Sequence, residues 1–231
     1  MLHRNEACRT VLKQGWLSQT PASFQGEVLA RCLLQRFKQG ASVYSIGDRP
    51  GGMFGLVAGG LGVTMAPQEE GPYVAHFAMP GTWFGEAAAF TRQPRMIGLT
   101  ATRDSELFHL PLSAVDEIVK RDPSAWRYLG LVTLDHLRLS LGAADDLMIR
   151  NHVKRFVAVL LRTAGCRLTT PPSQCPIEID INHEDLARMT NVARTTAGAI
   201  LRALEADGCV ALSYRRIEML APDRLRRMLR E

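Results

Sequence analysis

The sequence has no long apolar run and no paired cysteines. Nowhere do eighteen apolar residues follow one another, so no membrane-spanning helix is expected. The first residues, MLHRNEACRTVLKQ, lack the apolar core of a signal peptide, which predicts a cytoplasmic protein. The five cysteines form neither a CxxC pair nor a metal-ligand spacing, and we expect most of them to be reduced, inert thiols: Cys8, Cys32, Cys166, Cys175 and Cys209.

Motifs of catalysis are missing as well. The sequence contains no nucleophile with an adjacent base, no Walker loop and no cluster of metal ligands. Glu86 and Arg95 do not form a catalytic set. The sequence therefore predicts a binding protein without a metal, and not an enzyme.

The positive charge is concentrated in the C-terminal part of the chain. The formal net charge is +5. Residues 147–231 carry 14 Lys/Arg and 9 Asp/Glu, whereas residues 1–146 carry 14 of each. Such an excess is expected of a domain that binds a polyanion. A basic C-terminal tail is the alternative, because four arginines near the end supply much of the excess: Arg224, Arg226, Arg227 and Arg230.

Residues 182–208, NHEDLARMTNVARTTAGAILRALEADG, predict two short helices joined by a tight turn. Asn182 is suited to cap the first helix, with Asp185 in the reciprocal position. Asn191 tolerates the positive backbone angle of a tight turn, and Gly208 that of a helix end. Apolar residues at helical spacing predict the buried faces: Leu186, Met189, Ala197, Ile200, Leu201 and Leu204.

The other face of the second helix carries the candidate DNA contacts. This face comprises Arg194, Thr195, Thr196, Gly198, Ala199 and Arg202. The first turn of a recognition helix reaches base edges, and Arg194 is long enough to pair bidentately with a guanine. Thr195 and Thr196 are suited to a phosphate or a thymine methyl, and Arg202 to the DNA backbone. A helical hairpin with a solvated charged face is the alternative.

Three further features belong to this candidate DNA surface. Val210–Leu212 and Ile217–Leu220 predict a small hairpin, or wing, whose Arg215 and Arg216 are placed to touch a phosphate. His183 is another candidate contact. Ala193 is a poor N-cap for the second helix, which leads to the hypothesis that this helix start stays loose until DNA phosphates tighten it.

The N-terminal half predicts one helix followed by an antiparallel β-barrel or roll. Residues 20–35 have helical spacing. Short apolar strands punctuated by glycines follow: Val43–Ile46, Met53–Val57, Leu61–Met65, Val74–Phe77, Met96–Ala101 and Glu106–Leu110. Pro111 is placed to open the next helix.

A long helix is predicted from about Pro123 to Asp146. It carries a heptad seam, which predicts a dimer contact or, alternatively, packing on the chain's own barrel: Gly130, Leu134, Leu137, Leu141 and Ala144. Asp145 and Asp146 are the expected hinge. A helix over 148–164 follows, with Phe156, Val157, Leu160 and Leu161 inward, and then a proline-rich loop over 169–176.

In this order of elements the chain resembles the CRP/FNR superfamily of bacterial transcription regulators. Three segments carry the resemblance, which covers about residues 24–220: GASVYSIGDRPGGMFGLVAGGLGV (40–63), PGTWFGEAAAFTRQPR (80–95) and INHEDLARMTNVARTTAGAILRALEADG (181–208). The resemblance implies that Arg194, Thr195 and Ala199 touch bases. Many members have an acidic residue at the position of Thr195 and an arginine at that of Ala199, so a different half-site is expected.

The second segment resembles the phosphate-binding cassette of cyclic-nucleotide domains. The resemblance implies that Arg95 pairs with a phosphate, that Glu86 accepts from a ribose hydroxyl and that Gly85 allows close approach. Met96 stands where such proteins have a Ser or Thr donor, and a thioether cannot donate. Ser140 matches a base-binding hydroxyl, but the next residue is Leu141. A cyclic nucleotide is therefore doubtful; a Glu86–Arg95 pair in a vestigial barrel, or another small effector, are the alternatives.

The sequence offers few candidate residues for an iron–sulfur cluster, a haem or a redox-active thiol. Iron–sulfur members need several N-terminal cysteines, and only Cys8 is there. His76 and His109 are conceivable haem ligands, but a single histidine in a strand is more often structural. Oxidation of Cys175 or Cys209 is a further alternative.

We therefore expect an α+β protein with three parts. Residues 1–122 form an N-terminal helix and a jelly-roll-like antiparallel β-roll, 123–146 a dimerisation helix and hinge, and 147–231 a winged helix-turn-helix domain. The expected function is a homodimeric transcription regulator on near-palindromic double-stranded DNA, with RNA polymerase as an implied partner and no membrane. A cyclic-nucleotide-sensing module that acts through a protein partner is the alternative.

Overall fold

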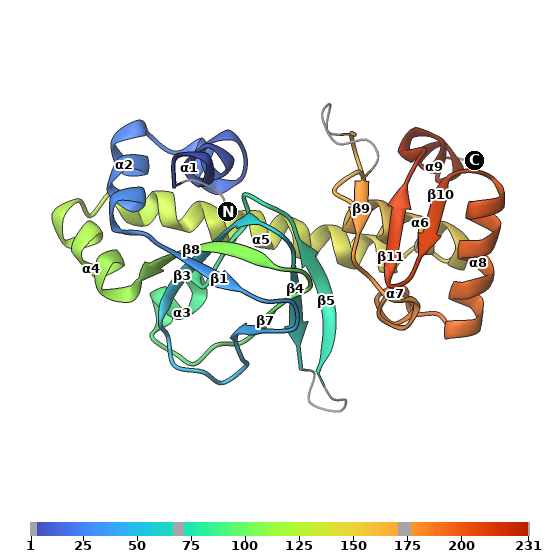
Figure 1. The fold of residues 1–231 in the computed structure, drawn as a ribbon, viewed down its shortest axis with the longest axis horizontal. Helices are drawn as coiled ribbons and strands as arrows, with labels where there is room; N and C mark the ends of the chain where they lie inside the picture. The colour runs from blue at the N-terminus through green and yellow to red at the C-terminus, as the bar shows by residue number, and fades with distance from the viewer. Residues whose placement is uncertain (1–3, 67–71, 171–176, 231) are drawn as a thin grey trace. The chain divides into compact units, whose positions relative to one another are not determined.

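The computed structural model describes residues 4–66, 72–170 and 177–230, which fall into two compact units. The first unit comprises residues 1–138 and the second residues 139–231. Figure 1 shows their elements as ribbons. The longest helix, α5 (Ala125–Leu147), begins in the first unit and ends in the second. Within the described ranges no helix is long and apolar enough to cross a membrane.

Two four-stranded antiparallel sheets form a β-roll in the first unit. One has the strand order β1 (Leu33–Phe37), β8 (Ser105–Pro111), β3 (Gly52–Ala58) and β6 (Trp83–Phe84). The other has the order β2 (Ser42–Tyr44), β7 (Gly98–Ala101), β4 (Leu61–Met65) and β5 (Tyr73–Ala78). This arrangement confirms the predicted antiparallel roll and the α+β class.

Strand β3 separates two hydrophobic cores, because successive side chains of a strand point to opposite faces. Phe54 and Leu56 face a core inside the roll. Met53 and Val57 face a second core, which lies between the roll and the helices. A strand covered on both faces is apolar throughout, and this explains why the segment lacks a polar–apolar alternation.

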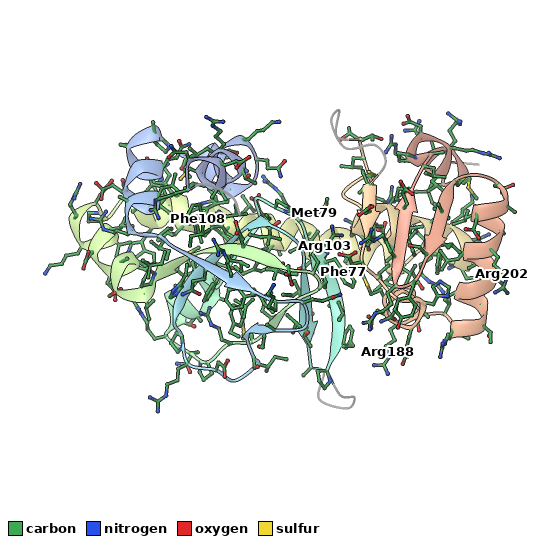
Figure 2. All side chains as sticks on the ribbon, in the orientation of Figure 1. Phe77, Met79, Arg103, Phe108, Arg188 and Arg202 are labelled. Atoms are coloured by element: carbon green, nitrogen blue, oxygen red, sulfur yellow. The ribbon has the colours of Figure 1, made fainter. Side chains whose placement is uncertain are left out.

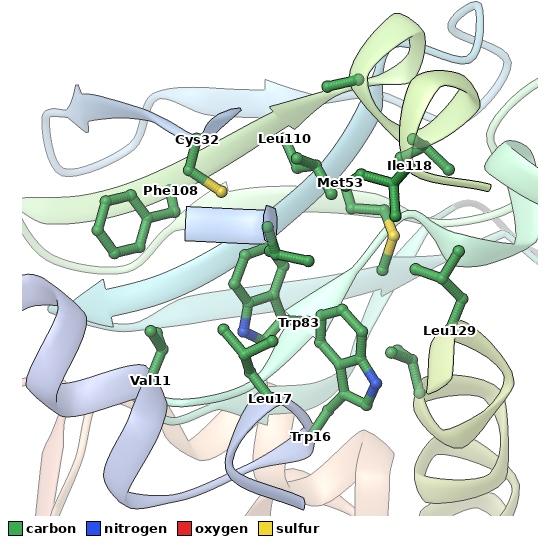
Figure 3. Close-up of a cluster of buried hydrophobic side chains, with 14 of the residues drawn as sticks. Val11, Trp16, Leu17, Cys32, Met53, Trp83, Phe108, Leu110, Ile118 and Leu129 are labelled. Carbon is green, nitrogen blue, oxygen red and sulfur yellow. The ribbon is translucent and has the colours of Figure 1, made fainter. Parts of the chain in front are cut away.

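The helices of the first unit cover the outer face of the roll. They are α1 (Arg4–Lys13), η1 (Trp16–Gln19), α2 (Ala22–Arg31), α3 (Glu86–Thr91), α4 (Leu112–Arg121) and the start of α5. Figure 3 shows Trp16 and Trp83 at the centre of the shared core. Their rings meet edge to face with centroids 5.2 Å apart, a favourable geometry for aromatic pairs.

The second unit contains the predicted helix-turn-helix and wing. Helix α6 (His152–Thr163) contacts α7 (His183–Thr190), α8 (Arg194–Ala206) and α9 (Pro222–Met228). A three-stranded sheet has the order β10 (Val210–Ser213), β11 (Arg216–Met219) and β9 (Ile177–Ile179). The four predicted inward residues of α6 are fully buried: Phe156, Val157, Leu160 and Leu161.

The predicted helix over residues 20–35 is wrong at its C-terminal end, over residues 32–35. Helix α2 ends at Arg31, Cys32 is extended, and Leu33 and Leu34 lie in β1, where they pair with His109 and Phe108 of β8. Helical spacing of apolar residues does not reveal such pairing, because the partner strand is distant in the sequence. Elements α1, α3, β6, β9 and α9 were not predicted, and four of these five are short. In α9, the predicted basic tail is partly ordered as a helix.

The connection between α5 and α6 differs from the predicted hinge. Asp145 and Asp146 both lie inside α5, and the residues outside a helix are 148–151. Helix α6 begins at His152, later than the predicted residue 148, because the side chain of Asn151 accepts hydrogen bonds from the backbone N–H groups of Val153 and Lys154. Of the predicted loop, residues 171–176, including Cys175, lie outside the described residues.

Candidate functional sites

The caps and the turn of the helix-turn-helix are those that the sequence predicts. The Asp185 N–H donates to Asn182 Oδ1 at 2.7 Å, and Asn182 Nδ2 donates to Asp185 Oδ2 at 2.7 Å. Asn191 adopts the left-handed conformation, with φ 51° and ψ 55°. Gly208 follows the end of α8 with φ 66°, and the carbonyl of Leu204 accepts from Cys209 N–H at 2.9 Å.

Helix α8 presents most of its predicted face to solvent. Arg194, Thr195, Ala199 and Arg202 are exposed, Thr196 is half-buried, and His183 is exposed at the start of α7. Gly198 also lies on this face but is buried, because the side chain of Arg202 covers it. The Arg202 side chain lies back along the helix, with Nη1 3.5 Å from the place where a Cβ of residue 198 would be. Figure 2 shows Arg202 on the outer side of α8.

The start of α8 has the weak cap that the sequence predicts. Ala193 occupies the N-cap position and makes no side-chain capping hydrogen bond. Ala193→Ser is expected to raise the free energy of unfolding of the second unit by about 1 kcal/mol, because a serine hydroxyl can accept from an unpaired N–H of the first turn. Amide exchange at Thr195 and Thr196 is expected to slow. Strong protection of these amides before the substitution would contradict a loose start, and Ala203→Ser, in the same helix, is the control.

The wing carries two candidate contacts with different surroundings. Arg216 lies in β11 and pairs with Glu178 at 3.2 Å and with Asp180 at 3.5 Å. Both contacts are partly exposed, and ion pairs of this kind contribute little free energy. Arg215, at the exposed tip, has a left-handed backbone with φ 56°. An arginine is unusual in this conformation, which makes Arg215 the stronger candidate of the two.

Arg155 positions the turn of the helix-turn-helix, a role that no motif in the sequence indicates. Its guanidinium donates to the backbone carbonyls of Thr190 at 2.8 Å and Asn191 at 3.2 Å, which belong to the turn. It also donates to the carbonyl of Ile149 at 2.9 Å, just before α6. A single side chain therefore joins the start of α6 to the turn that precedes the recognition helix.

The candidate effector site in the first unit centres on a buried arginine. Arg95 is only 4% exposed, and it donates to the carbonyls of Gly52 at 2.8 Å and Gly85 at 3.4 Å. Burial lowers the pKa of its guanidinium below the ordinary value. Gly85 is required here, because a Cβ at this position would lie 2.6 Å from Arg95 Nη1 and 2.5 Å from the Gly52 carbonyl oxygen.

Glu86 does not pair with Arg95, so the alternative of a mutual ion pair is wrong. Its carboxylate Oε1 lies 2.8 Å from His136 Nδ1, on α5. The His136 ring also stacks on Phe84, with centroids 5.1 Å apart. Among the residues that the structure describes, Arg95 has no carboxylate within ion-pair distance, and its partners are neutral carbonyls.

Met96 and Ser140 are the other two predicted effector residues. Met96 is 72% exposed, and its thioether has no hydrogen to donate to a ligand inside the roll. Ser140 lies on α5 in the second unit. The sequence therefore identified Gly85, Glu86 and Arg95 as neighbours. The partners of Arg95, Gly52 and Gly85, lie in two of the segments that carry the resemblance, whereas His136, the partner of Glu86, lies on α5, where the sequence indicated no partner.

The candidate haem and redox residues have structural surroundings. His109 Nε2 lies 2.8 Å from the Gly51 carbonyl, and the His109 ring stacks on Phe54 at 4.5 Å. Burial raises the pKa of Cys32 to about 12 and that of Cys209 above its ordinary value, which disfavours reactive thiolates. Over the described ranges, no group of three or more His, Cys, Asp or Glu residues is arranged to hold a metal.

The predicted seam residues of α5 are exposed in the single chain. Leu134 is 39% exposed, Leu137 51% and Leu141 62%, and Ala144 is also exposed. Their spacing of three and four residues places them on one face of the helix. Exposed leucines at heptad spacing are typical of a helix that packs on another helix.

Two family models match the chain, and together they cover more than half of it. Residues 34–122 match the cyclic nucleotide-binding domain, and residues 154–228 match the Crp-like helix-turn-helix domain. The chain belongs to the CRP/FNR superfamily of bacterial transcription regulators. The match to the cyclic nucleotide-binding domain lies within the first unit, and the match to the helix-turn-helix domain lies within the second unit. This is the order of domains that the sequence predicts.

Individual CRP/FNR relatives are distant in sequence. Vfr of Pseudomonas aeruginosa, a cAMP-activated global transcriptional regulator, is 22% identical over 192 residues, which are 80% of this chain and 87% of Vfr. The structure is similar to that of CLP, a c-di-GMP-responsive global regulator of Xanthomonas campestris, with a TM-score of 0.65, 18% identity and coverage of 87% of this chain and 99% of CLP. A CRP-family transcriptional regulator of Thermus thermophilus has a TM-score of 0.66 and 21% identity, with coverage of 85% of this chain and 97% of that regulator.

Proposed function

We propose that the protein is a homodimeric regulator that binds a specific, near-palindromic promoter site. The observation that carries the proposal is the exposed first turn of α8, where Arg194 and Thr195 follow the left-handed turn at Asn191. This turn belongs to the part of the chain with the excess of Lys and Arg over Asp and Glu. A recognition helix with these properties is suited to the major groove.

In the proposed complex, two copies of the second unit bind the two half-sites of the DNA. Joined through the exposed seam of α5, two recognition helices would enter successive major grooves about one helical turn apart. Contacts from Arg202, Arg215 and the N-terminal end of α7 at His183 would position the protein on phosphates, and Arg194 would read a base. RNA polymerase is the expected protein partner at the promoter.

The half-site should depend less on direct base contacts than in many members of the family. Thr195 and Ala199 are both exposed, but their side chains are short. Short side chains reach fewer base edges than a glutamate or an arginine would. Specificity would then come from Arg194 and from the shape and deformability of the DNA.

Arg194→Ala tests the proposal directly. Specific binding is expected to weaken by about 1–3 kcal/mol, roughly 5- to 150-fold, with relaxed selection at one base position of each half-site. Selection of binding sites from random DNA, followed by gel shifts at several salt concentrations, measures both effects. Arg49→Ala, which removes an exposed arginine from the β-roll, is the matched control. An equal loss on every sequence would mean that Arg194 touches only phosphate, and a wild-type chain that binds no DNA would favour a module that acts through a protein partner.

We also infer that the β-roll takes a small anionic effector. The support is the buried guanidinium of Arg95, which is hydrogen-bonded to neutral carbonyls and has no carboxylate within ion-pair distance among the described residues. An unpaired buried charge is costly, and a phosphate group would supply the missing negative charge. The residues fit such an anion better than they fit the full set of groups expected around a cyclic nucleotide, because Met96 cannot donate and Glu86 is bonded to His136. Vfr and CLP are described as responding to cAMP and to c-di-GMP, and both molecules carry phosphate.

A further inference from the structure

Tyr44 lies inside the β-roll against the guanidinium of Arg95. It is the last residue of β2, is 7% exposed, and belongs to the inner core together with Phe54 and Leu99. Its ring centroid is 4.2 Å from Arg95 Cζ, a cation–π distance. No sequence motif assigns a function to this tyrosine.

Two polar atoms of this pair are buried without a hydrogen-bond partner. They are the hydroxyl of Tyr44 and the Nε of Arg95, and both residues are more than nine-tenths buried. The two terminal nitrogens of Arg95 are already engaged with the Gly52 and Gly85 carbonyls. Leaving a buried donor unpaired costs free energy, so two such donors beside one buried cation indicate a missing acceptor.

The surroundings keep the Tyr44 hydroxyl protonated. Burial raises the pKa of Tyr44 well above its ordinary value, Arg95 opposes this shift, and Glu86 adds to it. Both charged side chains of the candidate effector site, Arg95 and Glu86, therefore act electrostatically on the phenol. A neutral phenol can donate a hydrogen bond over the whole physiological pH range.

The residue after Arg95 does not supply the hydroxyl donor that the family resemblance leads one to expect there. Met96 follows Arg95 directly, and its thioether is exposed and has no hydrogen to donate. Tyr44 comes from a different strand; its ring lies against the same guanidinium, and its buried hydroxyl has no hydrogen-bond partner.

We propose that Tyr44 is a ligand-binding residue whose hydroxyl, together with the Nε–H of Arg95, donates to the oxygens of one phosphate-bearing ligand. This inference rests on the anionic effector proposed above and names the residue that replaces the donor missing at Met96. A phosphate oxygen is the fitting acceptor, because it combines negative charge for the guanidinium with several lone pairs for the two donors.

Tyr44→Phe tests the proposal, because it removes only the hydroxyl. Without ligand, the variant is expected to melt about 2–4 °C higher than the wild type, since an unpaired buried donor has been removed. Inorganic phosphate, cyclic AMP and cyclic di-GMP are the probes, and they separate a bare phosphate from a nucleotide ligand. At least one of them is expected to bind the wild type in calorimetry, and Tyr44→Phe to bind that probe about 10-fold more weakly.

Several outcomes would overturn the role of Tyr44. A lower melting temperature of ligand-free Tyr44→Phe would mean that the hydroxyl already has a partner. Equal affinity of variant and wild type, or binding of none of the three probes, would also contradict it. Tighter binding by Tyr44→Ala would show that the ring fills the site instead of serving the ligand. Tyr73→Phe, in the same sheet, is the control, and DNA binding of the wild type in a gel shift is a separate readout of the regulator function.

Discussion

Asp146→Ala is expected to lower the free energy of unfolding of the second unit by about 3–5 kcal/mol, because it breaks a buried ion pair from one side. The carboxylate of Asp146 is fully buried. One oxygen lies 2.7 Å from Arg162, on α6, and the other 2.9 Å from Arg167 Nε, just after it. Removing the carboxylate leaves two guanidinium groups without their counter-ion. These groups are partly exposed, so the lower part of the range is expected.

The positions of the tryptophans make this effect measurable in the whole chain. All three tryptophans, Trp16, Trp83 and Trp126, lie in the first unit. Tryptophan fluorescence during urea unfolding therefore reports the first unit, while far-ultraviolet circular dichroism reports both. In Asp146→Ala, a part of the dichroism transition should move to lower urea while the fluorescence transition stays in place. Asp145→Ala removes the neighbouring exposed carboxylate and should change the free energy by less than about 0.5 kcal/mol.

Gly142 provides a second way to test the same ion pair. A Cβ on Gly142 would lie 2.2 Å from Arg162 Nη1, so Gly142→Ala must displace the guanidinium. The single variant should lose part of the stabilisation, although alanine is the better helix former. In the double variant with Asp146→Ala the two losses should not add, because both act on Arg162. Full additivity would contradict this account.

Leu137→Asp is expected to convert the proposed dimer into monomers and to weaken binding to a two-half-site promoter by about 100-fold or more. Leu137 is 51% exposed at the middle of the seam between Leu134 and Leu141. A carboxylate there would face a second copy of itself and would need to be desolvated on association. Once the two recognition helices are separate, the second half-site is no longer bound at a high effective concentration.

The solution mass and the DNA affinity together decide this prediction. Light scattering after gel filtration should give the mass of one chain for Leu137→Asp and of two chains for the wild type. Leu168→Asp is the matched control, because Leu168 is 84% exposed and does not lie on α5. An unchanged dimer mass in Leu137→Asp would place the dimer contact elsewhere.

The sequence by itself determined the features that depend on neighbouring residues. The Asn182–Asp185 cap, the left-handed turn at Asn191 and the end of α8 at Gly208 were all predictable, because capping and turn geometry use atoms only a few residues apart. The six predicted strands were predictable from short apolar runs between glycines, and the buried face of α8 from helical periodicity.

Only the tertiary structure decided the features that depend on distant partners. Strand β1 forms because Leu33 and Leu34 pair with residues of β8. Glu86 contacts His136 of α5 and not Arg95. Asp146 holds α6 in place instead of forming a hinge, because two arginines approach it across the fold. Hydrogen bonds and ion pairs act over a few ångströms in space, and a sequence pattern records only distance along the chain.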